Sequence, residues 1–334
     1  MEFLRLVRVE WVKTMRMRST YIAFVVAGIL VMTVQLGVYF NADESPFYRF
    51  LEANGFDTSL LVNAFIGTRL AMEVGFGLLM APMIILTFAR QVAGEDLRGT
   101  LRLMLVRPIG RLDLLLAKFL VCSLYVGLLM GFFLGLSYGM GIVLYGPKDS
   151  ITVARPWEVE PETGSGEAGG AAGPPNQRWE EMTEAERAQA RATRRGRRDR
   201  RFQTIARYVI TPGQGLKRLL IAWPLTSWAL LTVGSIAFFF SVINKHPIAA
   251  MALTVGTYFM VMILQGLASQ SNIIPLFQWI QPYLFTTAMD FWRGCFSVEI
   301  EWGSVGRHAA LLGGYTLGFF ALAQWIFWRK DITS

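Results

Sequence analysis

Six runs of mostly apolar residues constrain this chain more than any other feature. They lie at about 20–40, 68–89, 114–145, 219–243, 247–269 and 308–328. An α-helix rises about 1.5 Å per residue, so about 20 residues cross the roughly 30 Å of hydrocarbon in a bilayer. The third run is long enough for a tilted or protruding helix but too short for two crossings. The pattern predicts an all-α membrane protein with six transmembrane helices.

The composition agrees with a membrane protein rather than a soluble one. Of the 334 residues, 53% are hydrophobic and only 17% are charged, whereas a soluble domain carries about 25% charged residues. The net charge of +8 would indicate a nucleic-acid partner in a soluble protein. Here many of the basic residues flank the apolar runs, where Lys and Arg hold cytoplasmic loops in place. We therefore expect a lipid bilayer, and no nucleic acid, as a partner.

The sequence offers few residues arranged for catalysis, disulfide formation or metal binding. Cys122 and Cys295 have no disulfide or metal spacing, and His246 and His308 lie too far apart in sequence for a zinc motif. Glu73 and scattered hydroxyls in the spans form no nucleophile–base arrangement. The sequence contains no Gly-x-x-x-x-Gly-Lys-Ser/Thr phosphate loop. We expect no catalytic residue, metal or cofactor.

Basic residues predict the orientation of the spans. They precede the first span from Arg5 to Arg18, separate the second and third from Arg90 to Lys118, and follow the fourth and sixth at Lys245 and 329–330. With six spans these segments share one side, which the positive-inside rule makes cytoplasmic. The mainly acidic loop 41–67 fits the outer side. We expect a plasma-membrane protein with both termini in the cytoplasm.

The segment 147–218 departs from this charge pattern. Parity places it outside, although it contains the Arg-rich run 194–201, and loops longer than about 60 residues cross largely regardless of charge. Its first half predicts disorder. Its second half predicts a basic helix that starts with a capping box at Thr183 and Glu186. A solvated or headgroup-facing surface is the simplest interpretation, and a dock for substrate or partner stays open.

Two further segments are amphipathic or interrupted. Apolar residues recur every four positions at the N-terminus, at Phe3, Val7, Trp11 and Met15. With Arg5 and Lys13 pointing away, this favours an interfacial helix over a plain start of the first span. The apolar segment 270–307 is broken by Pro275 and Pro282, which predicts an outer re-entrant or interfacial hairpin at about 270–305. It would be either an exit gate or an interfacial anchor.

Two features lie inside the spans. Four glycines share one face of the third span, Gly127, Gly131, Gly135 and Gly139. Such a stripe favours close helix packing, within one chain or between two, although glycine is common in membrane helices anyway. In the second span Arg69 and Glu73 are one turn apart and Pro82 predicts a kink. The charged pair is either structural or part of a transport pathway.

The polar segment between the second and third spans contains a short charged stretch with a glycine at each end. Gly94 and Gly99 bracket Glu95, Asp96 and Arg98. Acidic residues near a helix N-terminus fit the helix dipole, so we expect a short helix parallel to the membrane. An ordinary cytoplasmic connector is the alternative.

This segment resembles the region after the second span in ABC type-2 transporter permeases. The matching residues are Glu95, Gly99-Thr100-Leu101, Arg107-Pro108-Ile109, Arg111 and Lys118-Phe119. The closing residues 327–332, Phe-Trp-Arg-Lys-Asp-Ile, are similar to the aromatic, basic, Asp-Ile ending of that family. The resemblance covers nearly the whole chain except about 147–215.

The resemblance implies a permease subunit of an ATP-driven exporter. Residues 91–106 would form a cytoplasmic coupling helix that docks on a separate ABC ATPase subunit, with contacts from Glu95, Asp96, Arg98, Gly99 and Thr100. A second permease subunit, identical or different, would complete the assembly. The chain then divides into 1–146 (interfacial helix, spans one to three and coupling helix), an outer insertion at 147–218, and 219–334 (spans four to six with the hairpin).

Two rival functions remain at this point. A membrane enzyme would need converging catalytic groups, which the spans lack. A non-transporting scaffold or sensor on the same fold would use the 147–218 loop as its binding element. The sequence does not identify a cargo.

Overall fold

The computed structural model of the chain describes residues 2–41, 63–100, 110–151, 209–269, 279–297 and 300–330. Within these ranges it is helical, apart from one antiparallel pair of two-residue strands, β1 (Ser150–Ile151) and β2 (Val209–Ile210). This confirms the predicted all-α class. The predicted basic helix after Thr183, the end of the expected coupling helix and the start of the outer hairpin lie outside the described residues.

Six helical segments are long and apolar enough to cross a membrane, as predicted. They are α2 (Arg18–Asn41), α4 (Ala64–Gly75) with η3 (Phe76–Met80) and α5 (Ala81–Ala89), α8 (Arg111–Tyr145), α11 (Pro212–Ile243), α12 (Pro247–Ser269) and α15 (Trp302–Arg329). Several begin earlier than hydropathy predicts. α11, for example, begins at a capping box in which Thr211 and Gln214 each bond the other's backbone N–H, with Pro212 in the first turn.

The second span changes its helical form halfway along. Five residues, η3, form a π-helix directly before Pro82, which lies in the first turn of α5. A π-helical turn and a proline are both recognised causes of a bend in a helix. Tyr258 of α12 donates a hydrogen bond of 3.1 Å to the carbonyl of Gly77 in this stretch. The irregular turn is thereby joined to a neighbouring span.

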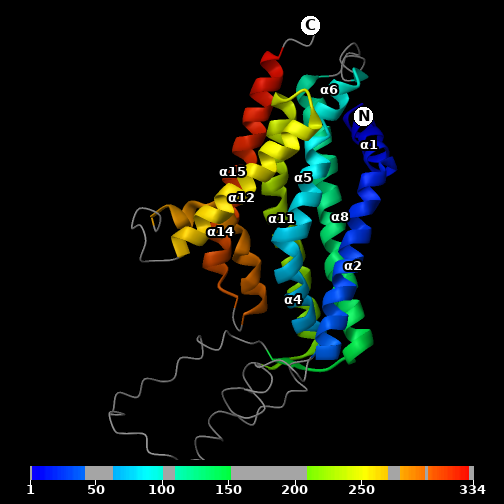
Figure 1. Cartoon of the computed structure of the whole chain (residues 1–334), viewed down its shortest axis with the longest axis vertical. Helices are drawn as coiled ribbons and strands as arrows, with labels where there is room; N and C mark the ends of the chain where they lie inside the picture. Colours follow the sequence, from blue (N-terminus) through cyan, green and yellow to red (C-terminus); the bar gives the residue numbers. More distant parts are fainter. Residues whose placement is uncertain are drawn as a thin grey trace, which may run out of the picture.

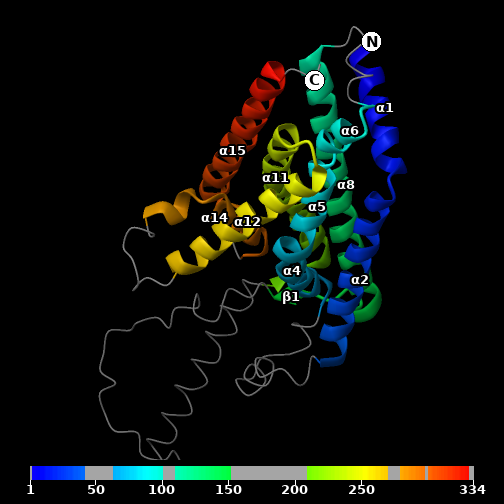
Figure 2. The same cartoon turned by 45° about the horizontal axis from the view of Figure 1, so that its top comes forward.

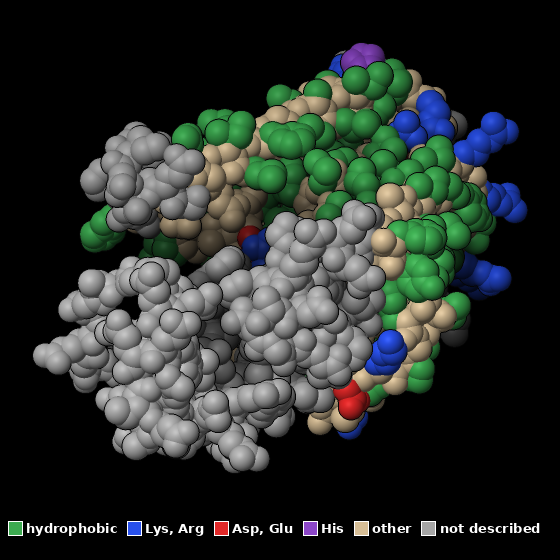
Figure 3. Space-filling model, turned by 60° about the horizontal axis from the view of Figure 1, so that its bottom comes forward, with side chains coloured by type: hydrophobic (Ala, Val, Ile, Leu, Met, Phe, Trp, Pro, Cys, Tyr) green, Lys and Arg blue, Asp and Glu red, His purple; other side chains and the backbone are tan. Residues whose placement is uncertain are grey.

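The long helices form a bundle with α11 at its centre (Figure 1). α11 packs against α5, α8, α12 and α15, and the most apolar part of α11 is 67% buried, compared with 22% for α2 and 17% for α12. α11 is therefore a core helix, whereas α2 and α12 face outward. Hydrophobic side chains cover much of the described surface in Figure 3, as a lipid-facing protein requires.

The two ends of the bundle differ in content. The first helix α1 (Glu2–Arg16), the short helix α6 (Ala93–Leu97) and both chain ends lie at one end, and the strand pair lies at the other (Figures 1 and 2). α1 and α2 are separate helices joined at Met17, where the Thr20 hydroxyl donates to the Thr14 carbonyl at 2.6 Å. An even number of crossings accounts for the shared side of the two termini.

Short helices follow α12 and pack back on the bundle. They are η4 (Gln281–Tyr283), α14 (Phe285–Met289) and η5 (Asp290–Phe296). Trp292 and Phe296 are buried, with ring centroids 5.7 Å from Phe76 and 4.9 Å from Phe65. The described part of the predicted hairpin is thus anchored on the second span, and its depth in a membrane stays a prediction.

Candidate functional site

The short helix α6 is held at its start by a side chain from another helix. The buried Ser241 hydroxyl of α11 accepts hydrogen bonds from the backbone N–H groups of Val92, at 3.1 Å, and Ala93, at 3.0 Å. It also donates to the carbonyl of Ala89 at 2.7 Å. The first N–H groups of a helix have no partner within the helix. Ser241 therefore caps α6 from outside and fixes it to α11.

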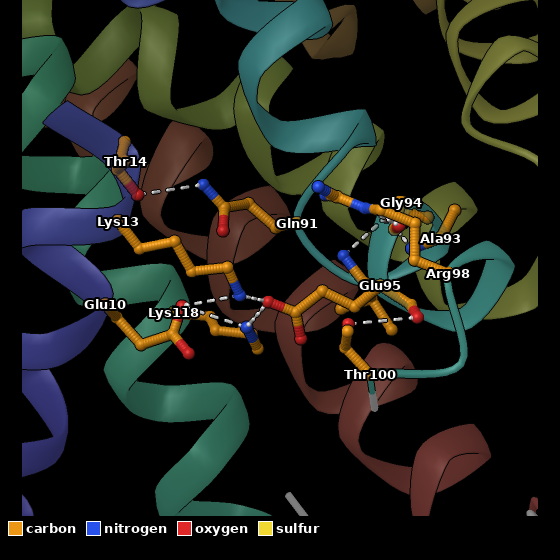
Figure 4. A network of polar contacts seen from close by, with 12 residues as sticks. Glu10, Lys13, Thr14, Gln91, Ala93, Gly94, Glu95, Arg98, Thr100 and Lys118 are labelled. Atoms are coloured by element: carbon orange, nitrogen blue, oxygen red, sulfur yellow. Dashed lines mark hydrogen bonds and ion pairs between the residues drawn. The ribbon is translucent and has the colours of Figure 1, made fainter. Parts of the chain in front are cut away.

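Four charged side chains meet beneath α6 and form what we call the charge cluster: Glu10, Lys13, Glu95 and Lys118 (Figure 4). Lys118 Nζ of α8 lies 2.7 Å from Glu95 Oε1 and 2.9 Å from Glu10 Oε2. Lys13 of α1 pairs with Glu95 and lies 3.8 Å from Glu10. The cluster joins α1, α6 and α8. Its two acids balance its two bases, so it carries no net charge.

Three of the four members of the charge cluster are shielded from solvent, and Lys13 is 27% exposed. The side chains of Glu10 and Lys118 are 0% exposed and that of Glu95 is 2% exposed. Charges taken out of water are tolerated only when paired and hydrogen-bonded. Close by, the Gln91 amide and the Thr14 hydroxyl are 3.5 Å apart, which adds a second link between α1 and the α6 segment.

Lys13 differs from what the sequence predicts. The pattern of α1 places it on the polar face, pointing away from the apolar residues, whereas the structure turns it toward Glu95. Burial lowers the pKa of Lys13 from its ordinary 10.5 to about 8, and the charge of Lys118 adds to this effect. The predicted apolar face, including Trp11 and Met15, is only half-buried against the protein.

A second set of contacts lies at the other side of α6, and we call it the C-terminal latch: Asp96, Arg111 and Lys330. Lys330 Nζ lies 3.0 Å from Asp96 Oδ2 and donates to the carbonyl of Val242 at 3.1 Å. Arg111 donates to the carbonyls of Phe327 and Trp328 at the end of α15 and to that of Lys330 just after it, over 3.0 to 3.5 Å. A guanidinium at a helix C-terminus satisfies carbonyls that lack partners within the helix.

The end of α6 is the part that faces solvent. Leu97 is 54% exposed, and Arg98 and Gly99 are also exposed. Arg98 Nε donates to the Gly94 carbonyl at 2.8 Å. Gly99 has a φ of 69°, a conformation that other residues adopt only with strain. The half-buried Thr100 reaches back to the Glu95 carbonyl at 3.4 Å.

The five expected ATPase contacts therefore divide into two groups. Arg98, Gly99 and Thr100 lie at the surface, as a docking site requires. The side chain of Glu95 is buried in the charge cluster, and Asp96 is engaged in the latch with only 15% of its side chain exposed. In this conformation Glu95 is not available to a docking protein.

The glycine stripe of α8 makes little close contact within the chain. A Cβ on Gly131 would lie 3.1 Å from the Trp223 ring nitrogen, which donates to the Gly127 carbonyl at 2.7 Å, but a Cβ on Gly135 or Gly139 would meet nothing within 4 Å. The closest approach is at Gly141 instead, where a Cβ would lie 2.6 Å from the Ala64 Cα. A packing role for the stripe between two chains stays a prediction.

The pair predicted at the start of the second span is present. Arg69 Nε lies 3.3 Å from Glu73 Oε1, and both side chains are partly exposed. A pathway role for the pair is not tested by this contact. Among the described residues no group of His, Cys, Asp and Glu side chains could hold a metal ion, and Cys122 and Cys295 are buried free thiols.

Comparison with known proteins shows that the N-terminal part of the chain is similar to one transporter family. Residues 6–154 match the family model described as ABC-2 family transporter protein. A search of the curated proteins found no match. The matched region runs from α1 through α8 and contains the entire charge cluster and all of α6. This match supports an ABC type-2 transporter permease, and the six helices suited to cross a membrane agree with it.

Proposed function

We propose that this protein is the permease subunit of an ATP-driven exporter and that its α6 segment receives the force of a separate ABC ATPase subunit. The observation that carries the proposal is the setting of α6. Its outer end is exposed at Leu97, Arg98 and Gly99, while its inner side is bonded to α1, α8, α11 and the end of α15. A force applied at one exposed turn thus acts on four helices.

The proposed ATPase contact surface consists of Leu97, Arg98, Gly99 and Thr100. Leu97 offers an apolar contact and Arg98 a cationic one, and arginine is among the residues that most often dominate protein interfaces. Glu95 and Asp96 have a different role in this proposal. They hold α6 to the bundle and pass its displacement on.

ATP would act through linkage. A partner that binds one conformation of the permease more tightly than the other shifts the population toward it by the difference in binding free energy. Because separating the buried charge cluster would leave unpaired charges, α6 cannot move without α1 and α8 following it. The chemistry of ATP stays in the partner, and the permease supplies the pathway.

The remaining parts of the proposal follow the resemblance to the family. A second permease subunit completes the pathway, both termini are cytoplasmic, and the cargo moves outward. The shared end of α1, α6 and the C-terminus supports one cytoplasmic face for docking. No contact of the described residues favours the alternative of a non-transporting scaffold or sensor.

A co-purification experiment tests the proposal. The permease is tagged in its native cells, extracted in mild detergent, and its bound proteins are identified by mass spectrometry. We expect an ATPase with a phosphate-loop motif to accompany the wild type and to be lost from a Leu97→Asp, Arg98→Glu variant.

The matched control is Leu216→Asp. Leu216 is 48% exposed, close to the value for Leu97, but it lies near the start of α11 at the strand-pair end of the bundle. This variant should retain the ATPase. Retention of the ATPase by the Leu97→Asp, Arg98→Glu variant, or absence of any such ATPase from the wild type, contradicts the proposal.

A further inference from the structure

Lys330 lies outside the family match at 6–154 and contacts α6 directly. Lys330, the first residue after α15, bridges Asp96 of α6 and the Val242 carbonyl near the end of α11. Arg111, the first residue of α8, holds the last carbonyls of α15. The ends of three long helices therefore meet at α6.

We propose that Lys330 is a positioning residue that makes α15 and α11 follow α6 when the ATPase displaces it. The inference rests on the proposed function and adds a second transmission route to it. The charge cluster joins α6 to α1 and α8, whereas the C-terminal latch joins α6 to α11 and α15. Charged and capping side chains thus bond α6 to α1 and α8 on one side and to α11 and the residue after α15 on the other.

α11 and α15 are bonded to each other along their length, so they respond together. The hydroxyls of Thr232 and Thr316 are 3.1 Å apart in the buried interface, and the rings of Phe238 and Phe320 stack at 6.2 Å. Sliding one helix past the other would break this polar contact and the packing around it. Packed cores shift between discrete arrangements and do not deform continuously, so a partial slide is unfavourable. The latch therefore acts on the pair as one unit.

One member of the α11–α15 pair, α15, also contacts the short helices that follow α12. The Tyr315 hydroxyl of α15 donates to the Tyr283 carbonyl of η4 at 2.9 Å, and the Tyr315 ring meets Phe285 of α14 edge-on at 6.0 Å. Tyr315 precedes Lys330 by 15 residues, which is about 22 Å of helix. A displacement at Asp96 would reach η4 and α14 through α15.

The test measures movement near η4 in the permease–ATPase complex. Spin labels are attached at Trp279→Cys, a position 81% exposed, and at Leu128→Cys on α8, 48% exposed, after Cys122 and Cys295 are replaced by Ala. Their separation is measured with and without ATP and vanadate in lipid nanodiscs. Wild type should change its distance distribution. Lys330→Met should lower the fraction of shifted molecules by about twofold or more, while the ATPase stays bound.

The matched control is the neighbouring basic residue. The guanidinium of Arg329 lies 4.2 Å from the centre of the Trp325 ring on the same helix, and Arg329→Met should leave the shift unchanged. The exchange Asp96→Lys with Lys330→Asp restores the ion pair but not the bond to the Val242 carbonyl. It should therefore recover part of what Lys330→Met loses, which a loss of packing alone would not permit.

The outcomes separate the latch from the proposed function. Absence of a bound ATPase from the wild type overturns the proposed function and the inference with it. A bound ATPase with an unchanged shift in Lys330→Met overturns the latch alone. If Lys330→Met does not fold, Asp96→Asn takes its place. In the purified permease alone, hydrogen exchange at 93–97 should be faster in either variant than in Arg329→Met, and equal rates also contradict the latch.

Discussion

Glu95 and Asp96 are adjacent in sequence, but their surroundings differ sharply. Glu95 is 2% exposed and pairs with Lys118 and Lys13 in the charge cluster, whereas Asp96 is 15% exposed and pairs with Lys330, which is 20% exposed. Successive residues on a helix point about 100° apart, so one turn of α6 serves both sides. The comparison indicates a rigid joint toward α1 and α8 and a weaker, adjustable joint toward the end of α15.

The largest expected effect comes from breaking the rigid joint. Lys118→Met removes the base that bonds both Glu10 and Glu95 and leaves buried carboxylates with too few partners. Removing one member of a buried ion pair costs about 3–5 kcal/mol. Denaturant unfolding in detergent should show a loss of this size, and a loss below about 1 kcal/mol would mean that the cluster is more hydrated than the structure indicates.

Removing the cap of α6 should cause the second largest loss of stability. Ser241→Ala leaves the Val92 and Ala93 N–H groups without their acceptor in a buried position. Loss of a helix cap costs about 1–2 kcal/mol. The same unfolding assay measures it, with Ser227→Ala of the same helix as control, because that hydroxyl bonds only to the Trp223 carbonyl one turn away. Equal losses in the two variants would argue against a specific role for Ser241.

The adjustable joint should matter little for stability. Lys330→Met and Asp96→Asn remove a partly exposed ion pair, and such pairs contribute about 0–1 kcal/mol. Both variants should unfold close to the wild type, and the difference should shrink further at high salt. A loss as large as that of Lys118→Met would end the distinction between the two joints.

The smallest effect at neutral pH concerns Lys13. Its pKa is about 8 in the folded protein, compared with an ordinary value of 10.5. Between these values the unfolded chain binds a proton that the folded chain has released, so this group makes stability rise with pH from about 8 to 10.5. The unfolding midpoint of the wild type, relative to that of Lys13→Met, should increase across this window. A flat difference would show that Lys13 keeps its ordinary pKa.

Much of the fold follows from local sequence. Apolar length predicts the six spans, and the i,i+4 spacing of Arg69 and Glu73 predicts their pair, because both depend only on helix geometry. The charge cluster could not be predicted in this way. Glu10 and Lys118 are 108 residues apart, and Lys118 resembles any basic residue that flanks a span. Glu10, an acid in the middle of a basic N-terminal helix, was the available signal.

Close packing was also difficult to locate from sequence. The regular stripe from Gly127 to Gly139 indicates a packing face, yet the closest approach at a glycine of α8 falls at Gly141, outside the stripe. Periodicity shows which residues share a face but not which face meets a neighbour. The exposed turn at Leu97 could be found from the family resemblance, whereas the burial of Glu95 required the assembled bundle.

Site-specific photo-crosslinking tests the central claim most directly. A photoreactive amino acid is placed at Leu97 or, as control, at Leu216, the tagged permease is irradiated in its native cells, and adducts are identified by mass spectrometry. We predict an adduct between position 97 and an ATPase that carries a phosphate loop, and none from position 216. If position 97 gives no such adduct, or if position 216 gives the same one, α6 is not the place where an ATPase acts on this protein.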